Sequence, residues 1–194
     1  NADEHYFSAS ALESFSVFTG VQQNRNPLLA ISYPADAQSI YDTTITVTGT
    51  ASDIDGDLWE VYVRMNDGSW SLASGKENWS LKFPLSFGNK KFEAKAVDYQ
   101  DAESVVDEHT IFAGVQLIPL FDLWSHFSAF LDPLQADIES IMQYPVSQNL
   151  INVMVNSSGS IYWPSENINT IGNWNPQTAY KIKMVDESMI LFKG

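Results

Sequence analysis

The sequence predicts a mostly β protein, with two facing antiparallel sheets followed by a smaller α+β module that is itself mainly β. Hydrophobic residues make up 44% and aromatic residues 13% of the 194 positions, which excludes a disordered chain. Apolar and polar side chains alternate with a period of two in many short runs rich in Thr, Val and Ile, which favours strands over helices. We expect three parts, at residues 1–26, 27–114 and 115–194.

The first part predicts one short helix and a linker. Three apolar residues recur at helical spacing and are followed by a glycine that ends the pattern: Leu12, Phe15 and Phe18. The polar run that follows, up to Asn26, is typical of a linker. A lone amphipathic helix needs a surface to pack on, so it docks either on the sandwich or on a domain upstream of Asn1.

The second part predicts seven short strands. Ile45 and Val47 lie on one face of their strand, and threonines lie on the other. Asn66-Asp67-Gly68 predicts a tight hairpin turn, because Asn and Gly tolerate a positive φ. The clearest other alternations are at residues 29–33, 59–65, 79–83, 91–96 and 105–112. This spacing is typical of an immunoglobulin-like antiparallel β-sandwich, which we place from Pro27 to about Ala113.

Three runs in this part resemble the bacterial immunoglobulin-like domains of secreted multidomain proteins. They lie at residues 31–36, 45–53 and 61–70, and residues 92–98 resemble the sixth strand of those domains. The resemblance implies the sandwich fold. It says little about function, because such modules serve as spacers, surface stalks and occasional binders.

The third part predicts a small α+β module. Asp132-Pro133-Leu134 indicates the start of a helix, and Ser157-Ser158-Gly159 indicates a turn between two strands. The expected strands lie at residues 150–155, 160–163, 179–184 and 188–192.

This module resembles one that recurs near the C-termini of secreted Bacteroidetes proteins. The resemblance rests on Ile161-Tyr162-Trp163-Pro164, on the run from Asn169 to Asn175, and on residues 179–184. Two positions depart from the pattern: Ala179 replaces a Gly, and Leu123-Trp124 replaces a Gly-Trp pair. The resemblance implies a secreted or cell-surface protein and no particular activity.

Charge and composition exclude several classes of partner and site. The chain has 24 acidic and 10 basic residues, a net charge of −14, which repels nucleic acid and anionic lipid. It has no Cys, so disulfides and thiolate chemistry are excluded, and no run approaches the length of a membrane span. The chain begins at Asn1 without Met or a signal-like segment, as expected of a mature product or a fragment.

The strongest candidate site is the acidic run Asp53-Ile54-Asp55-Gly56-Asp57. Alternating carboxylates around a Gly turn can bind a hard cation such as Ca²⁺. It is not an EF-hand loop, because the Gly comes two places early and Arg64 stands where the last Glu would be. In the predicted sandwich, the loop with Asp98 and Asp101 lies at the same end, so five carboxylates are expected there. The alternative is that these residues only form turns.

The other candidates are aromatic. An exposed Trp or Tyr on a β face can stack on sugar rings, and the expected ligand-binding residues are Tyr162, Trp163 and Trp174. Packing in the core is the alternative for each of them. No His pair with metal-binding spacing, nucleophile elbow or phosphate-binding loop occurs, so we expect no catalytic residues and no enzyme.

Two functions therefore remain open. One is a non-catalytic accessory segment, a spacer or surface-presentation module attached to an upstream domain of a secreted or cell-surface bacterial protein. The alternative is a module that binds a polysaccharide or a cell-surface protein through exposed aromatics or acidic loops. Neither reading requires a cofactor beyond the candidate Ca²⁺, and neither involves nucleic acid or insertion into a membrane.

Overall fold

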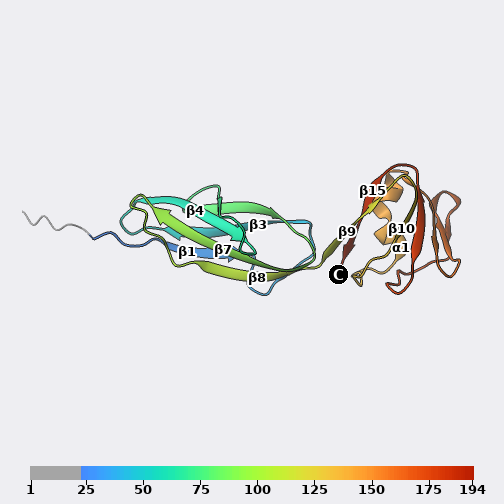
Figure 1. Cartoon of the computed structure of the whole chain (residues 1–194), viewed down its shortest axis with the longest axis horizontal. Coiled ribbons are helices and arrows are strands. Elements are labelled where there is room, and N and C mark those ends of the chain that lie inside the picture. The colour runs from blue at the N-terminus through green and yellow to red at the C-terminus, as the bar shows by residue number, and fades with distance from the viewer. Residues whose placement is uncertain (1–22) are drawn as a thin grey trace, which may run out of the picture.

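The computed structural model describes residues 23–194, which form two lobes placed end to end. Figure 1 shows a β-sandwich on the N-terminal side and a second unit, the C-terminal module, from strand β9 onward. Each lobe has its own set of buried apolar side chains. The expected N-terminal helix lies outside the described residues.

Two sheets face each other in the sandwich. One has the strand order β1-β3-β6, with β1 at Leu28–Tyr33, β3 at Thr44–Ser52 and β6 at Asn78–Pro84. The other has the order β2-β8-β7-β4-β5, with β2 at Ser39–Ile40, β4 at Leu58–Met65, β5 at Ser71–Leu72, β7 at Gly88–Asp98 and β8 at Asp107–Ala113. The short edge strand β2 pairs with β8 in parallel, and the other pairs are antiparallel.

The alternation along the strands places one face of each sheet in the core. On β3, Ile45 and Val47 are buried, whereas Thr46 between them is exposed. Phe92 from β7 and Trp79 from β6 are almost completely buried between the sheets. The predicted immunoglobulin-like β-sandwich is thus confirmed. Strands β2 and β5 were not expected, because two residues are too few to show an alternation.

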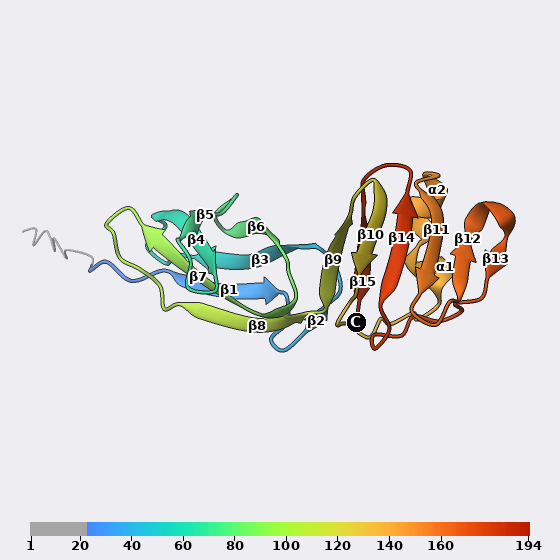
Figure 2. The ribbon, with the colours of Figure 1, turned by 45° about the vertical axis from the view of Figure 1, so that its right-hand side comes forward.

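The C-terminal module contains one larger sheet and a strand pair. The larger sheet has the order β10-β14-β11-β12-β13, and β9 pairs with β15 (Figure 2). The strands are β9 Val115–Leu120, β10 Leu123–Phe127, β11 Ile151–Asn156, β12 Ile161–Trp163, β13 Ile168–Asn169, β14 Tyr180–Met184 and β15 Ser188–Lys193. The helices are α1 Ile138–Ile141, α2 Gln143–Ser147 and a 3₁₀ turn at Pro164–Glu166.

The helix begins later than the sequence predicts. Asp137 caps α1 through its carboxylate, which accepts a hydrogen bond from the Ser140 backbone N–H at 2.9 Å. Residues 132–134 instead run beside β15, where the Leu134 N–H donates to the Lys193 carbonyl at 2.7 Å. The prediction that Asp132 starts a helix is therefore wrong, because the segment hydrogen-bonds to the last strand.

Stacked aromatic rings fill the core of the C-terminal module. The Trp174 ring stacks on Tyr180 with centroids 4.2 Å apart, and it also contacts Phe127 and Phe192. Trp174 is 5% exposed and Tyr180 is 1% exposed. Since aromatic side chains bury a large area each, this cluster dominates the packing of a small unit.

A single residue, Gly114, separates β8 of the sandwich from β9 of the module. Its N–H donates to the Ile40 carbonyl at 2.9 Å, and its own carbonyl accepts from the Gly194 N–H at 3.0 Å. A Cβ at Gly114 would lie 2.1 Å from the Gly194 oxygen and 2.7 Å from the Tyr41 ring, so only glycine fits there. Lys193 adds an ion pair with Asp42 at 3.2 Å. The junction is thus held by contacts on both sides.

Leu123 at the start of β10 adopts φ 62°, a conformation that costs an L-residue roughly 1–2 kcal/mol. We expect Leu123→Gly to stabilise the module by about 0.5–1 kcal/mol, since glycine removes this cost and only part is returned as unfolded-chain entropy. Little burial is lost, because Leu123 is 65% exposed. Urea unfolding monitored by tryptophan fluorescence measures the gain. Leu123→Ala keeps the strained φ and should bring no such gain; equal gains would contradict the explanation.

Candidate metal centre

Two acidic loops meet at the end of the sandwich that lies away from the C-terminal module. The first, residues 53–57, joins β3 to β4, and the second, residues 98–103, follows β7. Because Gly88 at the other end of β7 pairs with Ala113 beside the junction, Asp98 lies at the opposite end of the sandwich. A hydrogen bond of 3.0 Å from the Tyr99 N–H to the Asp57 carbonyl ties the loops together. We call this end the acidic pole.

The first loop turns so that Asp53 and Asp57 face the same side. The Asp53 Oδ1 accepts from the Asp55 N–H at 2.7 Å, and the Asp53 carbonyl accepts from the Gly56 N–H at 3.2 Å. Gly56 has φ 81°, a left-handed conformation that glycine adopts without strain. The turn occupies one oxygen of Asp53 and leaves the other, Oδ2, directed away from the backbone.

Asp98 is the most deeply placed carboxylate of the pole, with no exposed surface. Its Oδ1 accepts from the N–H groups of Gln100 and Ala102, each at 2.8 Å, and its Oδ2 accepts from Asn24 Nδ2 at 2.7 Å. Burial acts to raise the pKa of Asp98, but these hydrogen bonds outweigh it and hold the pKa below its ordinary value. Asp98 is therefore a buried carboxylate that stays ionised.

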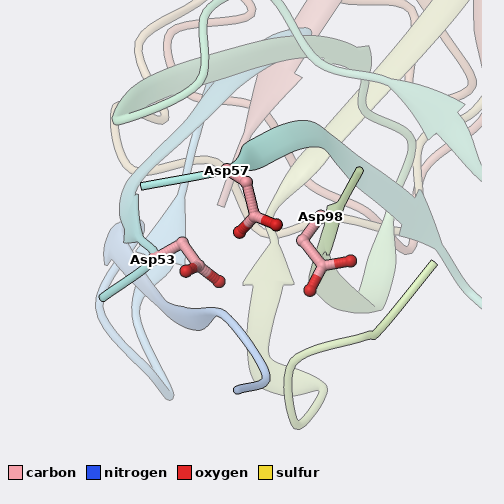
Figure 3. Close-up of side chains that lie close together, drawn as sticks. All are labelled: Asp53, Asp57 and Asp98. Carbon is pink, nitrogen blue, oxygen red and sulfur yellow. The ribbon is translucent and has the colours of Figure 1, made fainter. Parts of the chain in front are cut away.

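Three carboxylates converge at the pole: Asp53, Asp57 and Asp98 each offer an oxygen, and the three oxygens lie within 4.8 Å of one another. Figure 3 shows their side chains turned toward a common space from separate positions around it. The Oδ2 of Asp53 and the Oδ1 of Asp57 are buried and have no hydrogen-bond partner. Buried oxygens without a partner are costly, and a bound cation would offset that cost.

The structure brings together three of the five predicted metal ligands. Asp55 turns toward the N-terminal segment, where its Oδ2 accepts from the Arg25 N–H at 2.8 Å and its Oδ1 lies 3.8 Å from the guanidinium. Asp101 is exposed, has φ 64° and does not belong to the cluster. Both were expected in the site because sequence proximity does not distinguish the direction in which a loop side chain points.

Two polar residues at the site were not predicted. Gln100 Nε2 donates to Asp57 Oδ2 at 3.1 Å and to Asn24 Oδ1 at 3.2 Å, so it bridges the second loop to the N-terminal segment. Asn24 lies in the polar run that the sequence indicates as a linker. Nothing in that run marks one amide from another, so only the fold reveals that Asn24 reaches Asp98.

The three aromatic candidates do not lie together on an exposed face. Tyr162 and Trp174 are 6% and 5% exposed, inside the core of the module, whereas Trp163 is 39% exposed. Tyr162 lies at the centre of β12 with its ring inward, and Trp174 stacks on Tyr180. Two of the three rings therefore cannot meet a sugar in this structure, because the module needs them for its own packing.

Comparison with known proteins finds likeness only among solved structures. No family model matches the chain, and no curated protein matches it. The fibronectin(III)-like modules of Clostridium thermocellum CbhA are 25% identical over 45% of this chain, with a TM-score of 0.37. The endo-β-1,4-mannanase from Thermotoga petrophila is 14% identical over 47%, with a TM-score of 0.39. A PKD domain of a peptidase from a Thermoplasmatales archaeon is 21% identical over 47%, with a TM-score of 0.35.

These likenesses are partial on both sides. The aligned part covers 46% of the CbhA structure, 20% of the mannanase and 98% of the PKD domain. The chain thus spans about half or less of the first two. In residues 23–194, no helix has both the length and the apolar character needed to cross a bilayer.

Proposed function

We propose that the chain is a non-catalytic accessory module of a secreted or cell-surface bacterial protein, and that Ca²⁺ bound at the acidic pole stabilises its sandwich. The observation that supports the Ca²⁺ site is the pair of buried, unpartnered oxygens on Asp53 and Asp57 beside the buried, ionised Asp98. Without a cation, three carboxylates repel one another in a poorly hydrated space. With one, each unpartnered oxygen gains a ligand bond.

The spacing of the oxygens is compatible with calcium. The three oxygens at the pole lie within 4.8 Å of one another, and two oxygens bound to one Ca²⁺ can lie up to roughly 5 Å apart, twice a bond of about 2.3–2.6 Å. Calcium also accepts irregular loop geometry, which magnesium tolerates poorly.

The arrangement of the lobes supports the accessory role. The junction at Gly114 ties the C-terminal module to the sandwich at the end opposite the acidic pole. A hollow of about 630 Å³ on the module is lined mainly by apolar side chains, including Leu134, Tyr144 and Met189, and its lining contains no His, Asp or Glu. Its titratable side chains are Tyr144 and Lys193, so the hollow has no carboxylate or imidazole to act as a general acid or base.

Calcium is expected to raise the melting temperature of the sandwich. A ligand at one hundred times its Kd stabilises the folded state by about 2.7 kcal/mol, which is several degrees for a domain of this size. Calorimetry with Ca²⁺ and with a chelator measures this shift. Asp57→Asn should abolish it, and Asp101→Asn, a change in the exposed loop outside the cluster, should leave it intact. An identical melting temperature in both buffers would refute the site.

Terbium offers a direct measurement of binding. Trp59 and Tyr99, whose ring centroids are 4.3 Å apart, follow closely after Asp57 and Asp98 in the sequence. Tb³⁺ in the site should therefore be excited through these rings and be displaced by Ca²⁺. Absence of sensitised emission in the wild type would contradict the proposal.

Calcium binding is expected to weaken as the pH falls and not as it rises. The pKa of Asp98 is lowered in the folded state, so its contribution to stability is present above its unfolded pKa and is lost as the pH falls through the folded value. Because the lowered pKa keeps Asp98 ionised, protons should compete with the cation for Asp98 only below about pH 4, and its part of the calcium-dependent rise in melting temperature should decrease only there. A rise that disappears near neutral pH would point to a different ligand set.

A further inference from the structure

Four residues before the first strand, 23–26, form a strap across the acidic pole. Asn24 donates to Asp98, the Arg25 N–H donates to Asp55, and Asn26 Nδ2 donates to the Glu103 carbonyl at 2.7 Å. Gln100 Nε2 also donates to Asn24 Oδ1, so the strap contacts one residue of the first acidic loop and three of the second. Polar contacts at an exposed surface are weak individually, so the strap stays in place only while the loops beneath it keep their conformation.

Asn24 is the only strap residue in contact with the three-carboxylate cluster among the residues that the structure describes. Its amide lies between Asp98 Oδ2, which accepts from Nδ2 at 2.7 Å, and Gln100, which donates to Oδ1 at 3.2 Å. An amide oxygen is a common Ca²⁺ ligand, and rotation of the amide by half a turn exchanges its oxygen and nitrogen. After that rotation, Asn24 Oδ1 would face the cluster and Asp98 Oδ2 would be free to bind the cation. The hydrogen bond from Gln100 Nε2 to Asn24 would be lost, whereas the one from Gln100 Nε2 to Asp57 Oδ2 would remain.

We propose that cation binding and anchoring of the strap are coupled, with Asn24 as the fourth protein ligand. The inference rests on the Ca²⁺ site proposed above and adds a consequence for the chain that enters the sandwich. The cation holds the Asn24 side chain, and the hydrogen bonds of Arg25 and Asn26 hold the backbone of the strap. A segment that is tethered by weak hydrogen bonds without the cation becomes firmly held when the cation binds.

Trypsin can measure the coupling, because Arg25 is the only Lys or Arg before Arg64. Cleavage after Arg25 requires the strap to leave the pole, and it releases a single fragment, residues 1–25. Since cleavage of a locally opened segment follows the opening equilibrium, saturating Ca²⁺ is expected to slow this cut by at least about tenfold relative to chelator. Mass spectrometry of the released fragment gives the rate. An unchanged or faster rate with Ca²⁺ would overturn the coupling.

Three variants separate the coupling from the site itself. Asn24→Ala should still bind Tb³⁺, more weakly, but should lose the calcium-dependent protection. Asn26→Ala loosens the strap in both buffers and should keep the ratio of the two rates, because Asn26 contacts only the Glu103 carbonyl. Asp57→Asn removes a ligand of the site and so measures any direct effect of Ca²⁺ on trypsin itself. Ca²⁺ should not slow cleavage of this variant. Terbium binding without protection in the wild type would refute the coupling alone, whereas no terbium binding would refute the site as well.

Discussion

Trp174→Ala is expected to destabilise the C-terminal module by about 4 kcal/mol, within the range for removing a large buried aromatic side chain. The ring is 5% exposed and contacts Tyr180, Phe127 and Phe192, so its loss leaves a cavity bounded by three other rings. The buried residues form two clusters, and of the module's buried residues only Val115, next to the junction, belongs to the cluster of the sandwich. The loss should therefore fall on the unfolding of the module and leave that of the sandwich nearly unchanged.

Chemical unfolding followed by circular dichroism and fluorescence measures this effect as the shift of one of two transitions. Trp163→Ala is the matched control, because that side chain is 39% exposed on the same module and should cost much less. Trp174→Phe should also cost less than alanine, since it keeps a ring and removes an indole N–H that is buried without a partner. Equal losses for Trp163→Ala and Trp174→Ala would contradict the assignment of Trp174 to the core.

Gly49→Ala is expected to destabilise the sandwich by about 3 kcal/mol, at the upper end of the usual cost of overpacking. Gly49 on β3 pairs with Ile31 on one side and Trp79 on the other. A Cβ there would lie 2.2 Å from the backbone oxygen of Ala30 and 2.2 Å from the Trp79 ring. Neither group can move freely, because one belongs to a strand backbone and the other is 2% exposed. The added methyl group must displace β1 or the tryptophan.

Thr46→Ala is the control on the same strand. Its side chain is exposed, so the change should stay within about 0.5 kcal/mol. The difference between the two alanine variants in urea unfolding isolates the effect of crowding. A Gly49→Ala protein as stable as the control would show that the β1 backbone and the Trp79 ring leave room for a methyl group at this point.

The sandwich was predictable because its strands are long enough to alternate. Ile45 and Val47 against Thr46, for example, already separate the inner face from the outer one. The same strand order also placed the loops of Asp53 and Asp98 at one end, so the meeting of these carboxylates followed from topology. Topology does not contain the direction of each side chain, which is why Asp55 and Asp101 were expected beside the other carboxylates although the structure places them outside the cluster.

The C-terminal module was less predictable for physical reasons. An aromatic residue next to a loop, such as Trp174, has the same local pattern whether it packs inward or faces solvent. Its ring contacts decide between the two, and they include Phe127, which lies far away in the sequence, as well as the nearby Tyr180. Strand β9 contains Pro119, which argues against a strand, and β9 forms because β15 pairs with it from the end of the chain. Asn24 likewise acquires its role from a partner seventy-four positions away.

The single glycine between the lobes has a mechanical consequence. Only one residue separates the lobes, and the Gly194 N–H donates to the Gly114 carbonyl at the same point. We therefore expect the two lobes to keep a fixed relative orientation. The acidic pole lies at the end of the sandwich opposite this junction. The length of the sandwich therefore sets the distance between the strap and the C-terminal module.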